Sequence, residues 1–120
     1  TDNSDLVLKT GGSTSVEKTL NAVVESFIPL AGNFKYEPNH TGSGDGFKRT
    51  LGGEKDGANT IDIGFASREF KSDEAVDSAL ETGSYCLDAV VVVVNADNES
   101  IDSVDKATLN EYFAGTKTAW

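Results

Sequence analysis

The stretch DLVLKTGGSTSVEKTLNAVVESFIPLAGNFKYEP, residues 5–38, is the most informative part of the sequence about the fold. DLVLKT (5–10) has the composition of a short β-strand and runs directly into a turn of glycine and hydroxyl residues, GGSTS (11–15). Residues 16–30 then place apolar side chains three and four positions apart, which predicts an amphipathic helix. NFKYEP (33–38) again has strand composition. The stretch therefore predicts a strand–helix–strand unit of the α/β type.

The predicted helix within this stretch has one apolar stripe, which we expect to be buried against the sheet. Its members are Val16, Leu20, Val23, Val24, Phe27 and Ile28.

The same alternation continues along the rest of the chain. Residues 46–53, 72–80 and 103–115 have helical patterns with capping residues at their ends. NTIDIGFAS (59–67) and YCLDAVVVVVN (85–95) have strand composition. The second of these is a continuous β-branched run, which is typical of a strand buried on both faces. Strands alternating with helices indicate an α/β fold with a mostly parallel sheet and flanking helices.

Composition and charge exclude several classes of function. The chain has 120 residues, with 20 acidic and 10 basic side chains and a net charge of −10. This balance argues against binding to nucleic acid or to an anionic membrane surface, because both need clustered Lys and Arg. A small anion is still compatible, because fixed N–H and O–H donors can hold it locally. No signal segment opens the chain.

Catalytic, metal and cofactor sites find no support in the sequence. His40 is the only histidine and Cys86 the only cysteine, so no metal-ligand set with the usual spacing exists. Ser43 with His40, three residues apart in a glycine turn, does not amount to a catalytic triad. We expect Cys86 to be a buried structural thiol, because its neighbours are apolar. No cofactor and no enzymatic activity are predicted.

Three loops carry the candidate binding residues. TGGSTS, HTGSGDG and GFASRE each follow a predicted strand and precede a predicted helix. Ligands of open α/β sheets bind outside the carboxyl ends of the strands, where helix N-termini present unpaired N–H groups. The sequence therefore favours an oxyanion site at this edge. The candidate residues are Ser13, Thr14, Ser15, Gly42, Ser43, Gly44, Ser67 and Arg68.

Each loop also has a purely structural interpretation. Ser13 and Thr14 are good helix N-caps, and glycines at 42–46 are common in ordinary turns. Arg68 beside Glu69 could form a surface ion pair. The same position of all three loops in the predicted topology favours a shared binding site over capping alone.

Five segments together resemble the phosphate-binding proteins of phosphate ABC transporters, a periplasmic-binding-protein-like family. They match in order and spacing and span nearly the whole chain: GGSTSV (11–16), HTGSGDGFK (40–48), DIGFASREF (62–70), AVVVVVNADN (89–98) and LNEYFAGTKTAW (109–120). The resemblance implies a receptor whose two α/β lobes close over phosphate, working outside the cytoplasmic membrane, in the periplasm or as a lipoprotein anchored at the cell surface. Its implied partners are inorganic phosphate and the permease and ATPase of the transporter.

The resemblance also implies a role for each loop. Thr14 and Ser15 would donate to the anion, with Ser13 shaping the turn. Ser43 would donate through its hydroxyl and N–H at the start of a helix. Ser67 and Arg68 would contact the anion from the third loop.

One branch of the family has an aspartate at the Arg68 position that accepts the proton of hydrogen phosphate. Asp45 or a residue beyond this chain would have to supply that acceptor here. Sulfate or molybdate is therefore an alternative ligand. A flavodoxin-like or signalling α/β module is a further, less favoured alternative, because the predicted strand ends carry Ser, Thr and Gly and not clustered acids.

The resemblance predicts that the chain is a truncated protein. Residues 1–97 would form an incomplete first lobe of a type II periplasmic-binding-protein-like fold, and 98–120 the hinge exit and first helix of the second lobe. Such a fragment should bind phosphate weakly, because closure cannot bury the ligand. Loss of packing partners for 89–94 and 104–113 would leave apolar surface open and favour self-association.

Overall fold

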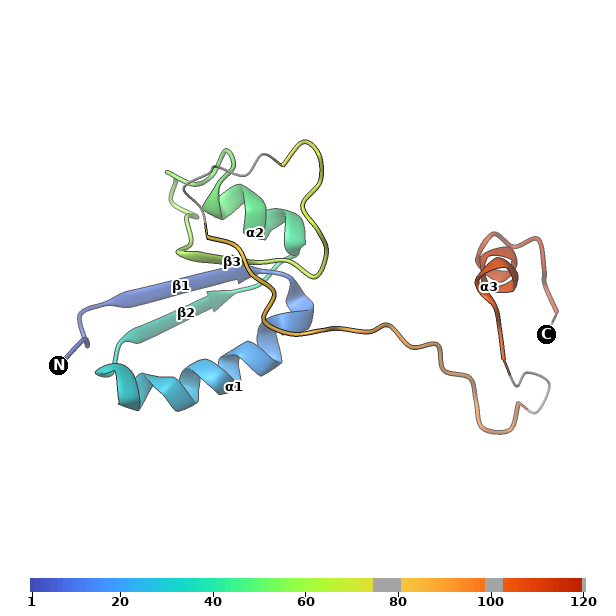
Figure 1. Ribbon diagram of the computed structural model, residues 1–120, viewed down its shortest axis with the longest axis horizontal. Helices are drawn as coiled ribbons and strands as arrows, with labels where there is room; N and C mark the ends of the chain where they lie inside the picture. The colour runs from blue at the N-terminus through green and yellow to red at the C-terminus, as the bar shows by residue number, and fades with distance from the viewer. Residues whose placement is uncertain (75–80, 99–102, 120) are drawn as a thin grey trace. The chain divides into compact units, whose positions relative to one another are not determined.

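A computed structural model of the protein describes residues 1–74, 81–98 and 103–119. The chain divides into two compact units, Thr1–Cys86 and Leu87–Trp120. The first unit contains a parallel sheet with helices, and the described residues of the second unit contain one helix (Figure 1).

The first unit is built on a three-stranded parallel sheet in the order β2-β1-β3. Val7 to Gly11 of β1 pair with Lys35 to Asn39, and Thr10 to Gly12 pair with Ile63 to Phe65. The strands are β1 (Val7–Gly12), β2 (Lys35–Asn39) and β3 (Ile63–Phe65), and the helices are α1 (Glu17–Phe27) and α2 (Ser43–Thr50). 3₁₀ turns at Thr14–Val16 and Ile28–Ala31 flank α1. The α/β fold class predicted from the sequence is confirmed.

The two helices lie on opposite sides of the sheet, because the chain reverses its direction of travel after β2 (Figure 1). It moves outward from β1 to β2 through α1, then back across β1 to β3 through α2. The segment after β1 and the segment after β2 therefore start at the same edge of the sheet and lead to opposite sides of it. Such a reversal is the place where open α/β sheets bind ligands.

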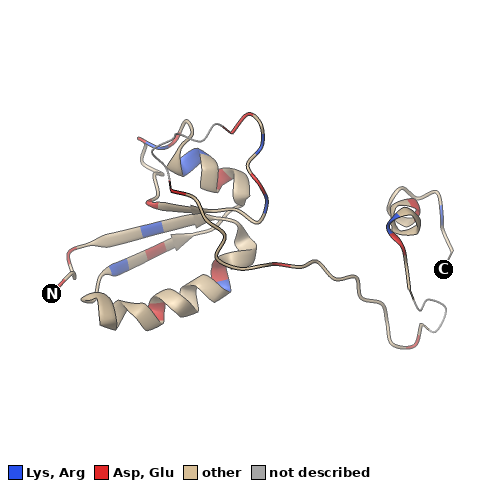
Figure 2. Cartoon of the chain, viewed as in Figure 1, with Lys and Arg blue, Asp and Glu red and all other residues tan. Residues whose placement is uncertain are grey.

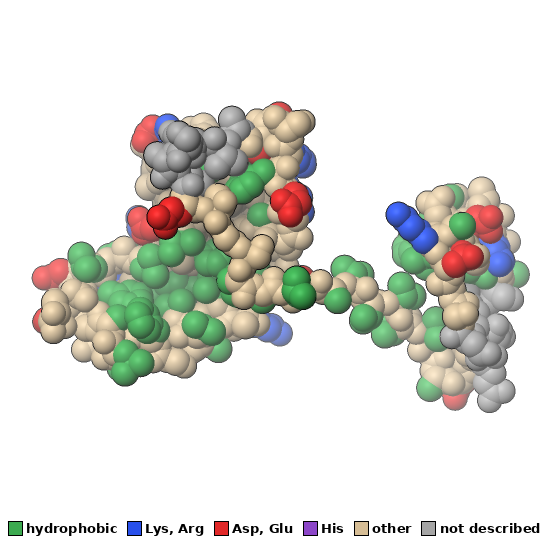
Figure 3. All heavy atoms as spheres, viewed as in Figure 1, with side chains coloured by type: hydrophobic (Ala, Val, Ile, Leu, Met, Phe, Trp, Pro, Cys, Tyr) green, Lys and Arg blue, Asp and Glu red, His purple; other side chains and the backbone are tan. Residues whose placement is uncertain are grey.

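Helix α1 covers the sheet with only part of its apolar stripe. Val16 and Val24 are buried, but Val23 and Phe27 are more than half exposed, so the predicted burial of the whole stripe is wrong. Val23 and Phe27 lie on the part of α1 that the three described strands do not cover. The exposed members contribute to an apolar patch visible in Figure 3.

Helix α2 lies unusually close to the sheet because glycines line the contact. A side chain at Gly46 would come within 2.7 Å of the Phe65 carbonyl oxygen and 3.0 Å of the Gly12 Cα. A side chain at Gly64 would come within 2.6 Å of the Gly46 oxygen. Real Cβ atoms do not approach other atoms this closely, so the geometry of α2 requires these glycines.

Strand β3 is shorter than the predicted 59–67 because the residues before it continue the pairing with β1 only in part. The Asp62 N–H donates to the Lys9 carbonyl oxygen at 2.9 Å. The Ile61 N–H donates to the Arg49 carbonyl oxygen on α2, at 3.2 Å. The Asp62 carboxylate accepts from the Lys9 N–H, at 2.8 Å, so a side chain occupies a position where a ladder bond would lie. Regular pairing therefore begins at Ile63.

The predicted strand at 85–95 does not form. These residues have no regular secondary structure, and the valines are open to solvent, with Val90 97 % exposed. A β-branched run becomes a strand only where another strand supplies ladder hydrogen bonds, and none does so in the described residues. Cys86 is exposed as well, so the prediction of a buried thiol is wrong.

The second unit keeps the last predicted helix in shortened form. Helix α3 (Lys106–Phe113) begins at Asp105, whose carboxylate accepts from the Thr108 N–H at 2.7 Å. Gly115 adopts a φ of +72° just after the helix, as expected of a residue that ends one. Most of the predicted helix 72–80 lies outside the described residues. None of the described helices has the length and hydrophobicity needed to cross a membrane.

Candidate functional site

The three candidate loops meet at the carboxyl edge of the sheet. The Gly42 N–H donates to the Gly12 carbonyl oxygen at 2.8 Å, which joins the loop after β2 to the loop after β1. The Ser13 N–H donates to the Phe65 carbonyl oxygen at 2.8 Å, which joins the loop after β1 to the end of β3. Parallel pairing places the strand ends side by side, and these two bonds hold the loops together there.

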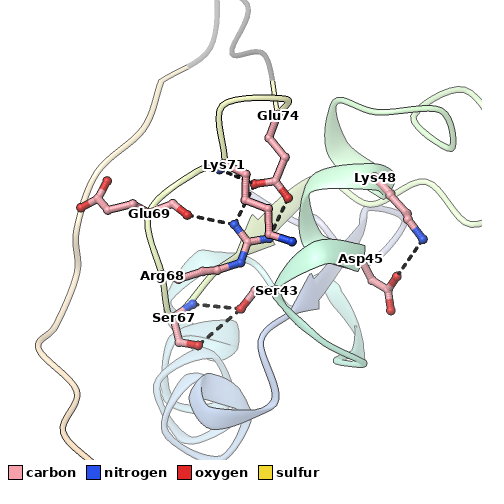
Figure 4. A network of polar contacts seen from close by, with 8 residues as sticks. All are labelled: Ser43, Asp45, Lys48, Ser67, Arg68, Glu69, Lys71 and Glu74. Carbon is pink, nitrogen blue, oxygen red and sulfur yellow. Dashed lines mark hydrogen bonds and ion pairs between the residues drawn. The ribbon is translucent and has the colours of Figure 1, made fainter. Parts of the chain in front are cut away.

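Ser43 and Ser67 join the second and third loops through their side chains (Figure 4). The two hydroxyl oxygens lie 3.3 Å apart, and the Ser67 N–H donates to the Ser43 hydroxyl oxygen at 3.2 Å. Ser43 is the first residue of α2, so its own N–H has no acceptor within the helix. Two hydroxyls and two backbone N–H groups from two loops are thus gathered at the positive end of a helix dipole.

The first loop presents one buried and two exposed hydroxyl residues. Ser13 is only 3 % exposed, and its hydroxyl lies 2.8 Å from that of Ser15. Ser13 occupies the N-cap position of the 3₁₀ turn, but its side chain makes no capping hydrogen bond. Thr14 and Ser15 are exposed at the same edge. The capping interpretation of these residues therefore does not account for their positions.

The glycines of the second loop have different roles. Gly42 is the N-cap of α2 with a φ of +145°, and its N–H is already engaged by Gly12. A side chain at Gly44 would meet no atom within 4 Å. The Gly44 N–H lies in the first turn of α2 and has no acceptor within the helix. Gly42 thus fixes the backbone conformation of the loop. The space beside Gly44 is open, so an anion can approach its N–H group.

Arg68 is held by Glu74 and not by the carboxylate of the adjacent Glu69. Its two terminal nitrogens donate to the two Glu74 oxygens at 2.7 and 2.6 Å, a bidentate ion pair (Figure 4). The Arg68 hydrogen bonds lower the pKa of Glu74 from its usual range to about 2. In turn, Glu74 raises the pKa of Arg68. One guanidinium nitrogen also donates to the Glu69 carbonyl oxygen at 2.9 Å.

Asp45, the candidate acceptor for a phosphate proton, points away from the serine pair in Figure 4. Its carboxylate lies 3.7 Å from the Lys48 ammonium, one turn along α2. A partly exposed pair of this type contributes little to stability. In this arrangement Asp45 interacts with its own helix and not with the gathered loops.

Two side chains near the loops have hydrogen-bond partners that the sequence analysis did not predict. Glu74 lies in a stretch expected to be a simple helix start, and its pairing with Arg68 depends on the fold of the loop. His40 is 8 % exposed and its Nδ1 lies 3.0 Å from the Ser13 carbonyl oxygen. The sequence analysis considered His40 only as a partner of Ser43, and no sequence pattern indicated its contact with Ser13.

The charge distribution around the loops offers no basic cluster. Lys and Arg side chains are scattered among acidic ones over the described residues (Figure 2). No group of three or more His, Cys, Asp or Glu suited to a metal ion occurs in that part of the chain. Attraction of an anion must therefore come from local donors, namely backbone N–H groups, hydroxyls and the Arg68 guanidinium.

Comparisons with known proteins identify the family of the chain. A family model described as a PBP superfamily domain matches residues 2–120. The phosphate-binding protein PstS of Staphylococcus aureus (strain USA300) is 28% identical over 125 residues, covering 98% of this chain and 36% of the relative. The same protein of strains COL and N315 matches equally well. The chain thus spans 36% of the length of these curated relatives. No solved structure matches the chain significantly.

Proposed function

The chain belongs to the PBP superfamily, and on this premise we propose that it forms one lobe of a solute-binding protein that captures inorganic phosphate. The observation that carries the proposal is the meeting of the three loops, with Ser43 and Ser67 in hydrogen-bond contact at the N-terminus of α2. The similarity to phosphate-binding proteins over 98% of the chain supports phosphate as the ligand.

The proposed chemistry is binding by hydrogen-bond donors and not catalysis. A phosphate oxygen placed between Ser43 and Ser67 would accept the Ser67 N–H and both hydroxyl hydrogens. The Ser67 N–H now donates to the Ser43 hydroxyl oxygen, and one of the two hydroxyls donates to the other. The N–H groups of Thr14, Ser15, Ser43 and Gly44 supply further donors at this edge. Donors fixed by the fold need no reorganisation, and they can outweigh the unfavourable long-range field of a chain with net charge −10.

Arg68 is the group whose role depends most on rearrangement. Its guanidinium has the fork geometry that suits a tetrahedral oxyanion, but both terminal nitrogens now contact Glu74. We propose that bound phosphate shares or replaces this contact. Replacing the ionised Glu74 by a neutral side chain should therefore leave Arg68 free for the anion.

The wider setting follows from the same premise. We propose that residues 1–97 form the first lobe, that 98–120 lead into a second lobe, and that the whole protein works outside the cytoplasmic membrane. Its partners would be the permease and ATPase of an ABC transporter. Phosphate binding by this part alone should be weak, because a second lobe would normally bury the anion.

Phosphate titration of the ¹⁵N-labelled chain tests the proposal. We expect saturable shifts of the backbone amides of Thr14, Ser43 and Ser67 at millimolar phosphate, and weaker binding in Ser43→Ala. Ser26→Ala is the matched control, because its hydroxyl donates to the Ala22 carbonyl oxygen on the exposed side of α1. Shifts that are absent, or that spread evenly without saturation, would contradict the proposal.

Competition with sulfate and molybdate decides which oxyanion the loops prefer. Arg68 stands where one branch of the family has a proton acceptor, so discrimination against sulfate rests on other groups. If phosphate is the ligand, its affinity should exceed that of sulfate. Equal shifts with both anions would identify a general oxyanion lobe.

A further inference from the structure

Arg68 is the only Lys or Arg in the three loops, and only part of its guanidinium is engaged. A guanidinium has five N–H hydrogens. Nη1 donates to Oε2 of Glu74 at 2.7 Å and to the Glu69 carbonyl oxygen at 2.9 Å, and Nη2 donates to Oε1 of Glu74 at 2.6 Å. Three hydrogens are thus used. The hydrogen on Nε and the second hydrogen on Nη2 have no acceptor among the described residues.

The two remaining hydrogens lie side by side on one edge of the guanidinium. The planar group can bind a pair of oxygens in two ways, end-on through Nη1 and Nη2 or side-on through Nε and Nη2. Glu74 occupies the end-on pair, and the side-on pair is open. In Figure 4, Glu74 lies on one side of the guanidinium, and Ser43 and Ser67 lie on the other. An anion held by the serine pair therefore approaches Arg68 from the side that Glu74 leaves open.

The carboxylate of Glu74 is firmly held in its place. Besides the two bonds from Arg68, Oε2 accepts from the Lys71 N–H at 2.9 Å, and the Glu74 N–H donates to the Lys71 carbonyl oxygen at 3.0 Å. The Glu74 side chain is 9 % exposed, whereas that of Arg68 is 32 % exposed. Hydrogen bonds from Arg68 and Lys71 lower the pKa of Glu74 to about 2, so it is ionised at neutral pH.

We propose that Glu74 is a positioning residue, which holds the end-on pair of Arg68 so that Nε and Nη2 are presented to phosphate. The inference rests on the proposed function, because it concerns how one donor of that site is oriented. The anion then shares Arg68 with Glu74 and does not replace it. An arginine side chain has many rotamers, and ordering it at the moment of binding costs free energy. Glu74 meets that cost in the free protein.

Replacement of Glu74 by the anion would be unfavourable. It would leave an ionised, largely buried carboxylate without its two strongest donors, and such a loss costs the full desolvation of the group. Sharing avoids this loss. The paired carboxylate reduces the positive potential of Arg68, but it leaves the Nε and Nη2 hydrogens as directed donors with the spacing of two phosphate oxygens.

Side-chain NMR distinguishes sharing from replacement. The chain has two arginines, so two Nε–H signals are expected. Phosphate that saturates the loop amides should shift the Nε–H signal of Arg68 and leave the carboxyl ¹³C signal of Glu74 unchanged. Arg49 is the internal control, because its Nε already donates to the Asn59 carbonyl oxygen at 2.6 Å and should not respond. An unmoved Arg68 signal, or a Glu74 signal that moves to the position of a free carboxylate, would overturn the inference.

Three variants connect the pair to affinity. Arg68→Lys keeps the charge but removes the side-on pair, and should weaken phosphate binding about tenfold, the effect of losing one charge-assisted hydrogen bond. Glu74→Gln should weaken it about fivefold, because Arg68 must then be ordered on binding. Glu69→Gln should change nothing, because Glu69 contacts Arg68 only through its backbone carbonyl. Tighter binding in Glu74→Gln would identify Glu74 as a competitor of the anion and overturn the inference.

The double variant separates orientation of Arg68 from a general ordering of the loop. Lysine has no side-on pair to orient, so adding Glu74→Gln to Arg68→Lys should weaken binding by less than about twofold. The same loss in both backgrounds would mean that Glu74 acts only on the loop, which would overturn the inference. Failure of the proposed function is distinguishable, because the amides of Thr14, Ser43 and Ser67 would then not respond to phosphate at all. If they respond while Arg68 Nε does not, only the role of Glu74 is refuted.

Discussion

Both units of the chain contain sequences typical of strands, but among the described residues only the first unit forms them. In residues 1–86, β1 pairs on both sides, although it ends in two glycines and contains a lysine. In residues 87–119, the five consecutive valines of 90–94 have a far stronger strand composition and form none. Whether a segment forms a strand therefore depends less on the strand preference of its residues than on the presence of a neighbouring strand.

The largest expected effect concerns the packing that makes the first unit stable. Gly46→Val would push a side chain into the Phe65 carbonyl and the Gly12 Cα, now 2.7 and 3.0 Å from a Cβ at that position. We expect a loss of about 3 kcal/mol in the free energy of unfolding, near the upper end for overpacking. Urea unfolding followed by circular dichroism measures it.

Gly44→Ala is the matched control for Gly46→Val, two residues away on the same helix. Its added methyl group meets no atom within 4 Å, and alanine is the better helix former. The variant should be unchanged or more stable by up to about 0.5 kcal/mol. Equal losses at both positions would mean that α2 does not rest on the sheet as described.

A smaller and local effect is expected in the second unit. Asp105→Ala removes the carboxylate that accepts from the Thr108 N–H at 2.7 Å. Helix α3 has only eight residues, and helices this short are marginal without capping or packing. Amide exchange across 106–113 should accelerate, while β1 keeps its protection. Ser103→Ala should change neither. Faster exchange of β1 in Asp105→Ala would contradict the prediction that the effect is confined to the second unit.

Sequence patterns predicted the first unit well because its partners are close along the chain. The elements β1, α1 and β2 lie within residues 7–39, so each of them packs against an element that is close to it in the sequence. The meeting of the three loops also followed from sequence order, because parallel strands end at one edge. Glu74 and His40 could not be found this way. Their roles arise from hydrogen bonds that fix loop geometry, and single residues carry no periodic signal.

Acid should loosen the third loop before the sheet. The pKa of Glu74 is lowered from 4.5 to about 2 by Arg68, so the ionised form is bound more tightly in the folded loop than in the unfolded chain. The stabilisation is complete above about pH 4.5 and is lost as pH falls toward 2. The protection factors of the amides at 67–71, which correct for the intrinsic slowing of exchange in acid, should therefore fall over this interval.

Glu74→Gln should remove that pH dependence and leave exchange already raised at neutral pH. Glu69→Gln is the matched control, because Glu69 contacts Arg68 only through its backbone carbonyl. A pH response that survives in Glu74→Gln would show that another carboxylate orders the loop. The first unit should otherwise unfold at the same urea concentration in both variants.

The smallest expected effect is the sharpest test of the comparison between the units. Val92→Asp places a charge in a side chain that is 61 % exposed, within a segment that forms no ladder hydrogen bonds. The free energy of unfolding of residues 1–86 should change by less than about 0.5 kcal/mol. Self-association should weaken, because the charge interrupts the open valine run visible in Figure 3.

Val24→Asp is the same substitution at a buried position of α1 and should unfold the first unit, because an unpaired charge would be forced into its core. Light scattering measures association, and urea unfolding measures stability in both variants. If Val92→Asp also costs several kcal/mol, residues 90–94 are buried in a sheet after all. In that case residues 90–94 would pair with another strand, and their composition would have predicted their structure correctly.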